Sequence, residues 1–353
     1  MNQTSIDVRL VDNEDSSTWN DYVNSHPKAS PYHLYGWLSA VNTAYGHTIS
    51  GAIATDNSTG KVVGIFPAIT MSIPFWGRQV CSLPYCDVGY GLADNEQILS
   101  TMQSYLIEQI QTSSAKYHEV RGLLPAPMDS HSMEHQKVRM LLELPEGSEA
   151  LLASFKSKLR SQIRKAEKNG LTFQLGQSTK LLDDFYSVYA ENMRDLGSPA
   201  HARKWFRAIV DAYQEDCVIS VVYLDDLPIG AGIVLSCNTK ACIPWASTLQ
   251  RHNRLAPNML LYWSLLAHCA DNNKQEFDFG RSTYEEGTYR FKKQWGAQPQ
   301  LLNWQKLNQN KETIPQAFTE PGQSRALVEN IWKKLPVSVS VLLGSRLRPF
   351  ISL

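Results

Sequence analysis

The sequence predicts a mixed α/β fold in which one order of elements occurs twice. In each half, a strand hairpin is followed by another strand, a long helix and a closing strand. Similar intervals separate Gly64 from Arg121 in the first half and Gly230 from Arg281 in the second. We interpret this pattern as a duplicated unit. Because the matched residues are few, two unrelated α/β stretches remain the alternative.

The spacing of apolar residues predicts the elements of the first half. Residues 6–10 alternate as in a half-buried strand, and a hairpin follows over 48–71. Residues 78–85 form a further predicted strand. We expect the long helix over 96–113 and the closing strand over 117–122.

The second half repeats this order. Its segment KACIPWAS echoes RQVCSLPY of the first half in its basic start, its Cys and its Pro-aromatic pair. The predicted elements are strands at 218–224, 228–237 and 240–247, a helix at 258–270 and a closing strand at 276–282.

Length and composition limit the protein class. The 353 residues suffice for two domains, and we expect them over 1–145 and 146–310, with a linker and amphipathic tail over 311–353. The 34 basic residues balance the 34 acidic ones, which argues against coating nucleic acid through bulk charge. No apolar stretch is long enough for a membrane span, no secretory signal is visible, and no CxxC pair occurs. We therefore expect a cytoplasmic protein with reduced cysteines.

A basic amphipathic helix is predicted between the halves, within 146–170. Apolar residues recur along one side at helical spacing, and Gly170 is placed to end the helix. The other side carries Lys156, Lys158, Arg160, Arg164, Lys165 and Lys168 against the single acid Glu167. Two interpretations stay open: a solvated helix face, or a binding surface for a polyanion such as a nucleotide diphosphate or tRNA.

The tail carries a second apolar pattern. Leu327, Ile331 and Trp332 begin it, and a stretch with four basic residues follows, IWKKLPVSVSVLLGSRLRPFISL. A helix that packs back on the protein and a peripheral contact with the inner membrane are the two interpretations.

The densest group of polar residues lies in 277–296, FDFGRSTYEEGTYRFKKQWG. Asp278 points to the opposite side of a predicted strand from its two Phe neighbours, and Gly280 permits a close backbone approach. Arg281 and Ser282 follow at the carboxyl end of the strand, where open α/β sheets bind ligands. A short helix then presents Lys292, a cation suited to phosphate. The structural alternative is an Asp–Arg pair beneath a packed helix.

FDFGRS followed by GTYRFKKQWG resembles the pattern of the FemAB-related acyltransferases, in particular the branch that accompanies bacterial exopolysaccharide and PEP-CTERM/exosortase systems. The resemblance extends in the same order over most of the chain, through YHLYGW at 32–37, VVGIFPA at 62–68, SLPYCDVGYG at 82–91, LRSQIRKAEKNGL at 159–171 and ENMRDLGSP at 191–199. It implies two tandem GNAT-like domains with mixed sheets flanked by helices. It also implies acyl transfer from an activated carrier to an amine or hydroxyl of a cell-envelope or exopolysaccharide precursor.

The resemblance implies roles for individual residues. Lys292 would stabilise donor phosphate or the developing oxyanion, while Arg164 and Lys165 would face an anionic substrate. We assign Asp278, Arg281 and Lys292 to catalysis, with Glu285 and Glu286 as further candidate bases. The residues assigned to substrate binding are His33, Trp37, Tyr85, Arg164, Lys165, Asn192, Arg194, Ser282, Phe291 and Trp295.

Two donor classes stay open, aminoacyl-tRNA and acyl-CoA, each as a co-substrate rather than a tightly bound cofactor. FemAB-type enzymes use aminoacyl-tRNA. Acetyl-CoA-dependent GNAT domains carry a glycine-containing turn before their long helix, but the corresponding stretch here, RLAPNM at 254–259, has no glycine. Its backbone N–H groups therefore have less room to surround a pyrophosphate. No G-x-S-x-G elbow is present, so we expect direct transfer rather than a covalent intermediate.

Three alternatives compete with this prediction. His131-Ser-Met-Glu-His135 matches the H-x-x-E-H zinc pattern, but flanking prolines make it loop-like and no third ligand is evident, so we expect no metal site. An acyl-CoA-dependent N-acetyltransferase of nucleotide sugars or polysaccharide is the second. The third is a non-catalytic scaffold of the exopolysaccharide/exosortase machinery.

Overall fold

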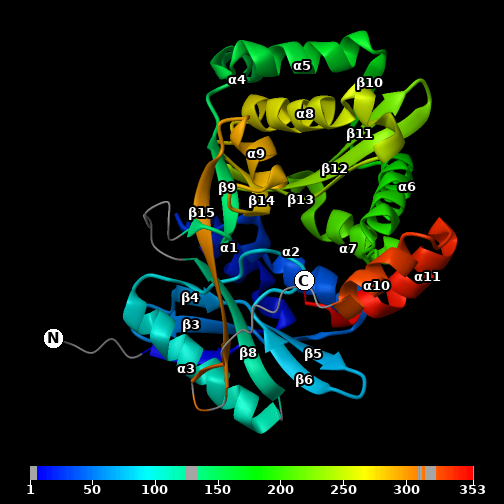
Figure 1. The fold of residues 1–353 in the computed structure, drawn as a ribbon. Helices are drawn as coiled ribbons and strands as arrows, with labels where there is room; N and C mark the ends of the chain where they lie inside the picture. Colours follow the sequence, from blue (N-terminus) through cyan, green and yellow to red (C-terminus); the bar gives the residue numbers. More distant parts are fainter. Residues whose placement is uncertain are drawn as a thin grey trace. The chain divides into compact units, whose positions relative to one another are not determined.

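A computed structural model describes residues 6–113, 115–123, 133–308, 310, 312–314 and 323–352 (Figure 1). The chain forms two units. The first comprises residues 1–126, 301–318 and 350–353, and the second comprises 127–300 and 319–349.

The first unit contains two sheets and three α-helices in its described residues. One sheet has the order β1 (Ile6–Leu10), β3 (Ala52–Asp56), β4 (Val62–Phe66) and β7 (Leu92–Ala93). The other has the order β15 (Gln298–Leu307), β8 (Ala115–Leu123), β6 (Gly77–Cys81), β5 (Ile69–Ile73) and β2 (Thr48–Ile49), and β16 (Thr313–Ile314) pairs with β15. The helices are α1 (Ser16–Ser25), α2 (Tyr35–Tyr45) and α3 (Glu96–Ser113).

The second unit is a sheet covered on both faces. Its strands have the order β10 (Leu171–Gly176), β11 (Cys217–Leu224), β12 (Leu227–Cys237), β13 (Lys240–Thr248), β14 (Glu276–Thr283) and β9 (Lys137–Glu143). On one face lies α8 (Pro257–Asp271), overlaid by α4 (Ser148–Ser154) and α5 (Ser157–Lys168); on the other lie α6 (Thr179–Leu196) and α7 (Arg203–Tyr213) (Figure 1). The remaining helices are α9 (Gly287–Lys293), α10 (Gln323–Trp332) and α11 (Val337–Leu347).

Strand pairing confirms that the order of elements is duplicated. In the first unit β3 and β4 form an antiparallel hairpin, and β6 and β8 are parallel neighbours connected through α3. In the second unit β11 and β12 form the antiparallel hairpin, and the parallel neighbours β13 and β14 are connected through α8. One difference concerns the hairpin predicted over 48–71, whose returning half, residues 61–71, is expected to be a single strand. They form two strands, because Pro67 between β4 and β5 has no N–H to donate.

The unit boundaries differ from those expected at residues 145 and 310. β9 follows the first repeat in the chain, yet it pairs antiparallel with β14 of the second unit. Residues Leu302–Leu307 of β15 follow the second repeat, yet they pair antiparallel with β8 of the first unit. The strand that follows each repeat in the chain therefore pairs in the sheet of the other unit, which local sequence patterns do not reveal.

The central helix shows how the apolar pattern produces packing. The predicted helix over 146–170 is divided into α4 and α5 at Phe155, whose backbone is extended. Leu159, Ile163 and Ala166 are buried against α8, whereas the basic residues of α5 lie on its other side. Gly170 follows with a φ of +81°, which a glycine adopts without strain, and the chain turns directly into β10.

No helix in the described part of the chain is long and apolar enough to cross a membrane. All six cysteines are buried thiols. Burial raises the pKa of Cys81, Cys217 and Cys269 to about 12, so these thiols stay protonated at neutral pH.

A buried histidine of the first unit is expected to destabilise the unit in acid. His118 on β8 has no exposed surface, and neither ring nitrogen has a hydrogen-bond partner. Burial lowers the pKa of His118 to about 4. The unfolded chain therefore binds this proton first, and its contribution to the free energy of unfolding is lost as the pH falls from about 6.5 to about 4.

The free energy of unfolding of the wild type should fall between about pH 7.5 and about pH 4.5. We predict that His118→Leu makes this fall about 2–3 kcal/mol smaller. Urea denaturation at both pH values measures this difference. His135→Asn, at an exposed position, is the matched control and should keep the wild-type pH dependence. If His118→Leu also keeps the wild-type dependence, another group causes the acid sensitivity.

Candidate functional site

The sheet of the second unit opens between its two parallel strands. β13 and β14 pair only from Lys240–Cys242 to Glu276–Asp278, although β13 continues to Thr248 and β14 to Thr283. Beyond Cys242 and Asp278 the two strands have no ladder with each other in the described residues. Beyond this point the facing edges of β13 and β14 do not pair with each other, and the Gly280 and Arg281 carbonyls of β14 accept hydrogen bonds from Lys292 instead.

A bulge shapes β14 at this opening. The register between β14 and β9 shifts between Asp278 and Arg281, and Gly280 within the shift has a φ of +73°. The Asp278 carboxylate accepts a hydrogen bond from the Gly280 N–H at 2.8 Å. Glycine is favoured at this position because other residues rarely adopt that backbone conformation.

Lys292 on α9 stabilises the bulge through two hydrogen bonds to its backbone. Its Nζ donates to the carbonyl oxygens of Gly280 at 2.9 Å and Arg281 at 2.8 Å, and its side chain is buried. The predicted catalytic residues Asp278, Arg281 and Lys292 are therefore brought together. The contacts assign Lys292 first to positioning β14, because its ammonium bonds to backbone rather than projecting into open space.

The structure adds Arg139 to this group. Arg139 on β9 is buried, its Nη1 lies 3.4 Å from Asp278 Oδ2, and its Nε donates to Gln300 Oε1 at 2.7 Å. Sequence analysis missed it because Arg139 is far from Asp278 in the chain. The available signal was an arginine between apolar residues, VRMLL, which in a strand indicates a buried partner.

Ser282 presents an unsatisfied hydroxyl in the same strand. It lies on β14 beyond the last pair with β13, and its Oγ is buried without a hydrogen-bond partner. A buried hydroxyl left unpaired costs about 1–3 kcal/mol, so a ligand that supplies the missing bond recovers this free energy. The other candidate bases, Glu285 and Glu286, are exposed in the turn before α9.

The N-terminus of α8 follows directly after the end of β13, through the 3₁₀ turn η5 (Gln250–Leu255). Ala256 there has a φ of +62°, Pro257 has no N–H, and the N–H of Met259 donates to the Ala256 carbonyl at 3.0 Å. These residues offer fewer backbone donors to a pyrophosphate than a glycine-containing turn.

The basic helix reaches the same turn. At the C-terminal end of α5, Asn169 Nδ2 donates to the Leu255 carbonyl of η5 at 3.2 Å. Arg164, Lys165 and Lys168 on α5 and Arg254 in η5 are all exposed. The end of α5 that carries Lys165 and Lys168 therefore lies beside the turn before α8.

Asn192 and Arg194 lie on α6 and bond to other parts of the second unit. Asn192 Nδ2 donates to Ser247 Oγ of β13 at 3.1 Å, which places it beside the divergent half of that strand. Arg194 bonds to Asp195 at 2.6 Å and donates to the Leu335 carbonyl at 3.2 Å. Arg194 thus anchors the connection between α10 and α11, which differs from the substrate contact predicted for it.

Phe291 and Trp295 belong to an aromatic cluster beneath α4 and α8. The Phe291 ring lies 5.0 Å from that of Tyr262, and the Trp295 ring lies 5.4 Å from that of Phe155. Trp295 is only 1% exposed. Both rings pack α9 against the rest of the unit. The structure therefore places Trp295 in the core and not at the substrate contact predicted for it.

The predicted residues of the first half fix one loop of the first unit. Trp37 Nε1 donates to the Pro84 carbonyl at 3.0 Å, and His33 Nε2 lies 2.9 Å from the Tyr90 carbonyl. Tyr85, with a φ of +69°, donates its N–H to the Ser352 carbonyl at 2.6 Å. All three side chains are buried, so His33, Trp37 and Tyr85 shape this loop instead of lining an open surface.

In the first unit this loop hydrogen-bonds to β8, at the position where β13 and β14 separate in the second unit. The N–H groups of Ser82 and Gly89 donate to the carbonyls of Glu119 and Arg121 on β8, at 2.8 Å each. Arg121, the counterpart of Arg281 in the repeat, is fully buried and bonds to Glu119, Cys86 and Ser352. The first unit therefore satisfies this strand edge and its arginine internally. In the second unit the buried Ser282 hydroxyl has no partner among the described residues, and we take this place as the candidate site.

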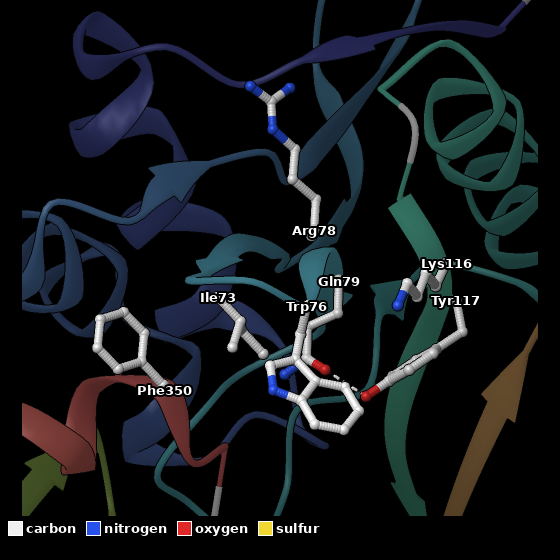
Figure 2. A pocket seen from close by; sticks show the side chains of 8 residues that line it. Ile73, Trp76, Arg78, Gln79, Lys116, Tyr117 and Phe350 are labelled. Atoms are coloured by element: carbon white, nitrogen blue, oxygen red, sulfur yellow. Dashed lines mark hydrogen bonds between the residues drawn. The ribbon is translucent and has the colours of Figure 1, made fainter.

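A cavity of about 310 Å³ occurs elsewhere in the first unit, beside the β5–β6 hairpin (Figure 2). In Figure 2 the Trp76 indole lies near Gln79 and Tyr117, whereas the guanidinium of Arg78 points away from them. The Tyr117 hydroxyl donates to Gln79 Oε1, so two of the polar groups satisfy each other. Except for Phe350 from the C-terminal segment, its lining comes from the hairpin and the start of β8, and none of the predicted site residues is among them.

No group of three or more metal-ligating side chains occurs among residues 6–113, 115–123, 133–308, 310, 312–314 and 323–352. His131 of the H-x-x-E-H pattern lies outside the described residues.

Comparisons with known proteins support a transferase fold. Residues 153–293 match the family model of the acetyltransferase (GNAT) domain. No curated protein matches the sequence. The structure is similar to that of FemX, with a TM-score of 0.65 and 13% identity over 84% of this chain and 95% of that chain.

Two further solved structures show the same fold. L-PGS from Bacillus licheniformis has a TM-score of 0.54 and 10% identity, covering 93% of this chain and 99% of that chain. A tandem GNAT protein from the clavulanic acid biosynthesis pathway has a TM-score of 0.50 and 12% identity, covering 88% and 100%. The predicted fold of two tandem GNAT-like domains is confirmed. The opening between β13 and β14 lies within the residues that match the GNAT domain.

Proposed function

We propose that this protein transfers an acyl or aminoacyl group from an activated carrier to an amine or hydroxyl of a cell-envelope or exopolysaccharide precursor. The divergence of β13 and β14, inside the GNAT-matching residues, is the observation that carries the proposal. The two strands separate next to Ser282, whose buried hydroxyl has no hydrogen-bond partner in the described structure. We place the reaction in the cytoplasm, at the inner face of a bacterial inner membrane, in a PEP-CTERM/exosortase or exopolysaccharide setting.

Direct transfer suits the groups available. The acceptor nitrogen or oxygen forms a bond to the carrier's carbonyl carbon, the carbon–oxygen or carbon–sulfur bond to the carrier breaks, and the acceptor proton passes to the leaving atom. The barrier falls through positioning and through hydrogen bonds to the oxyanion, for which the Ser282 hydroxyl is a donor. Burial holds the thiols of Cys217 and Cys269 protonated, which supports a mechanism without a thioester on the protein.

Aminoacyl-tRNA is the donor that the site favours. The turn before α8 provides few N–H groups for the pyrophosphate of CoA, since Pro257 lacks one and that of Met259 is already bonded. The exposed cations of α5 instead suit an extended phosphate backbone, and they end beside that turn. An acyl-CoA-dependent transfer to a nucleotide sugar is the second candidate, favoured by the match to the acetyltransferase (GNAT) domain.

We predict that Arg164→Ala combined with Lys165→Ala weakens binding of aminoacyl-tRNA about tenfold at low salt. The salt dependence of log affinity should also become shallower by about two, because each lost phosphate contact reduces the slope by about one. Filter binding across a salt series measures both quantities. Lys61→Ala, an exposed cation in the first unit, is the matched control and should change neither.

Two results would contradict the proposed donor. One is an unchanged tRNA affinity in the double variant. The other is selective thermal stabilisation of the protein by acetyl-CoA with no response to aminoacyl-tRNA, which would establish the acyl-CoA-dependent alternative.

A further inference from the structure

We infer that α10 and α11 form a surface that docks onto an anionic phospholipid bilayer. The inference does not depend on which acyl donor or acceptor the protein uses. It rests on three features of the second unit: how α11 is held, which side chains it leaves exposed, and which charges lie beside them.

Small residues hold α11 close to the rest of the second unit. Ser340 and Gly344, one helical turn apart, are buried, and a Cβ at position 344 would come within 2.7 Å of the Ala200 backbone nitrogen. Trp332 at the end of α10 is also buried, and Arg194 donates to the Leu335 carbonyl between the two helices. Packing therefore fixes the inner face of α11 and the connection that leads into this helix.

The outer faces of both helices are apolar and exposed. The exposed fractions lie between 38% and 62% for Leu327, Val328 and Ile331 on α10 and for Val339, Leu342, Leu343 and Leu347 on α11. Their spacing places each set on one side of its helix. Elsewhere in the described second unit, only Phe173, Leu196 and Leu227 are large apolar side chains with comparable exposure. Such concentration on two adjacent helices indicates a surface that another apolar phase covers.

The charged residues from Lys333 to the end of α11 all have one sign, whereas Glu329 within α10 is half-buried against Gly197 of the same unit. Lys333, Lys334 and Arg346 are exposed, and no Asp or Glu occurs from residue 330 to the end of the chain. A helix with leucines on one side and cations beside them is typical of segments that lie in the interface of an anionic leaflet. A protein partner or a second copy of this chain would cover the same leucines, but neither explains why the flanking charges are uniformly positive.

The test is co-sedimentation of the full chain with vesicles of phosphatidylcholine alone and vesicles that also contain phosphatidylglycerol. We expect binding only to the second kind. Leu342→Gln with Leu343→Gln should weaken it at least tenfold, because burial of both apolar side chains is lost. Lys333→Gln with Lys334→Gln should weaken it about fivefold for each lysine removed. Leu227→Gln, a single exposed leucine on the second unit, is the matched control and should bind like the wild type.

Three results would overturn the inference. Equal binding to both kinds of vesicle would show that charge plays no part, and unchanged binding of the leucine double variant would show that α11 is not the contact. Sedimentation velocity supplies the third: a dimer that the leucine double variant abolishes, without any vesicle binding, would assign the surface to a second copy. Far-UV circular dichroism of each variant confirms that α11 remains folded.

Discussion

Replacing Arg121 by methionine is expected to lower the free energy of unfolding of the first unit by about 3–5 kcal/mol. Arg121 is fully buried, and its Nε and Nη2 donate to Glu119 Oε1 at 2.9 and 2.7 Å. Removal of the guanidinium leaves the Glu119 carboxylate buried near Lys306, whose ammonium is 3.9 Å away. A buried charge without its close partner is the main source of the loss.

The same substitution also releases the loop and the C-terminal segment. Arg121 donates to the carbonyls of Cys86 and of Ser352, the latter at 3.0 Å, and its guanidinium lies 4.9 Å from the Trp304 ring centre. Urea denaturation followed by tryptophan fluorescence measures the change. Trp304 contacts Arg121, so tryptophan fluorescence also senses the local change. Circular dichroism, which senses secondary structure, should give the same midpoint.

The control separates a buried pair from an ordinary ion pair. Arg203→Ala breaks a bond to Asp183 at a site where both side chains are largely exposed, and we expect a loss below about 1 kcal/mol. The double variant Arg121→Met with Glu119→Leu should regain much of the stability, because no charge is then left buried. A loss below about 1 kcal/mol for Arg121→Met would contradict the assignment of Arg121 as the internal counterpart of the open site.

Lys292→Met is expected to lower the free energy of unfolding by about 2–3 kcal/mol and to reduce acyl transfer about a hundredfold. The ammonium bonds to the Gly280 and Arg281 carbonyls, so methionine leaves one buried and one partly buried acceptor without their donor. The bulge then relaxes and Ser282, two residues beyond Gly280, loses its position. Transfer of labelled amino acid from aminoacyl-tRNA to a lipid- or nucleotide-linked precursor measures the rate.

Lys293→Ala provides the matched control, since this neighbouring lysine is exposed on the same helix. It should leave both stability and transfer near the wild-type values. A scaffold without catalysis predicts no transfer by the wild type and no change in partner binding in Lys292→Met. Full transfer activity in a folded Lys292→Met variant would show that the bulge in β14 does not organise the site.

Local patterns predicted most elements of the fold. The duplicated order, the basic helix and the closing strands depend on spacings of two or three to four residues, and such spacings are visible in a short window of sequence. The cluster of Asp278, Arg281 and Lys292 was predictable for the same reason, since one strand, one turn and one short helix carry all three residues.

The functions of several residues were not predictable in this way. The predicted substrate contacts include His33, Trp37 and Tyr85. In the structure their hydrogen bonds fix a buried loop instead. Arg139 was missed because its partner Asp278 is separated from it by more than a hundred residues of chain. An aromatic or charged residue has the same appearance in sequence whether it meets a ligand or another residue of the protein.

The sequence by itself determined the repeated order of elements, the apolar and basic sides of α5 and the apolar pattern of the tail, because each depends on neighbours within one or two turns of chain. Only the tertiary structure decided which sheet receives β9 and β15, that Lys292 bonds to backbone, and that the second unit is open where the first is closed. Those outcomes depend on pairing between segments far apart in the chain, and the free energy of such pairing is set by burial and by hydrogen bonds that no local pattern encodes.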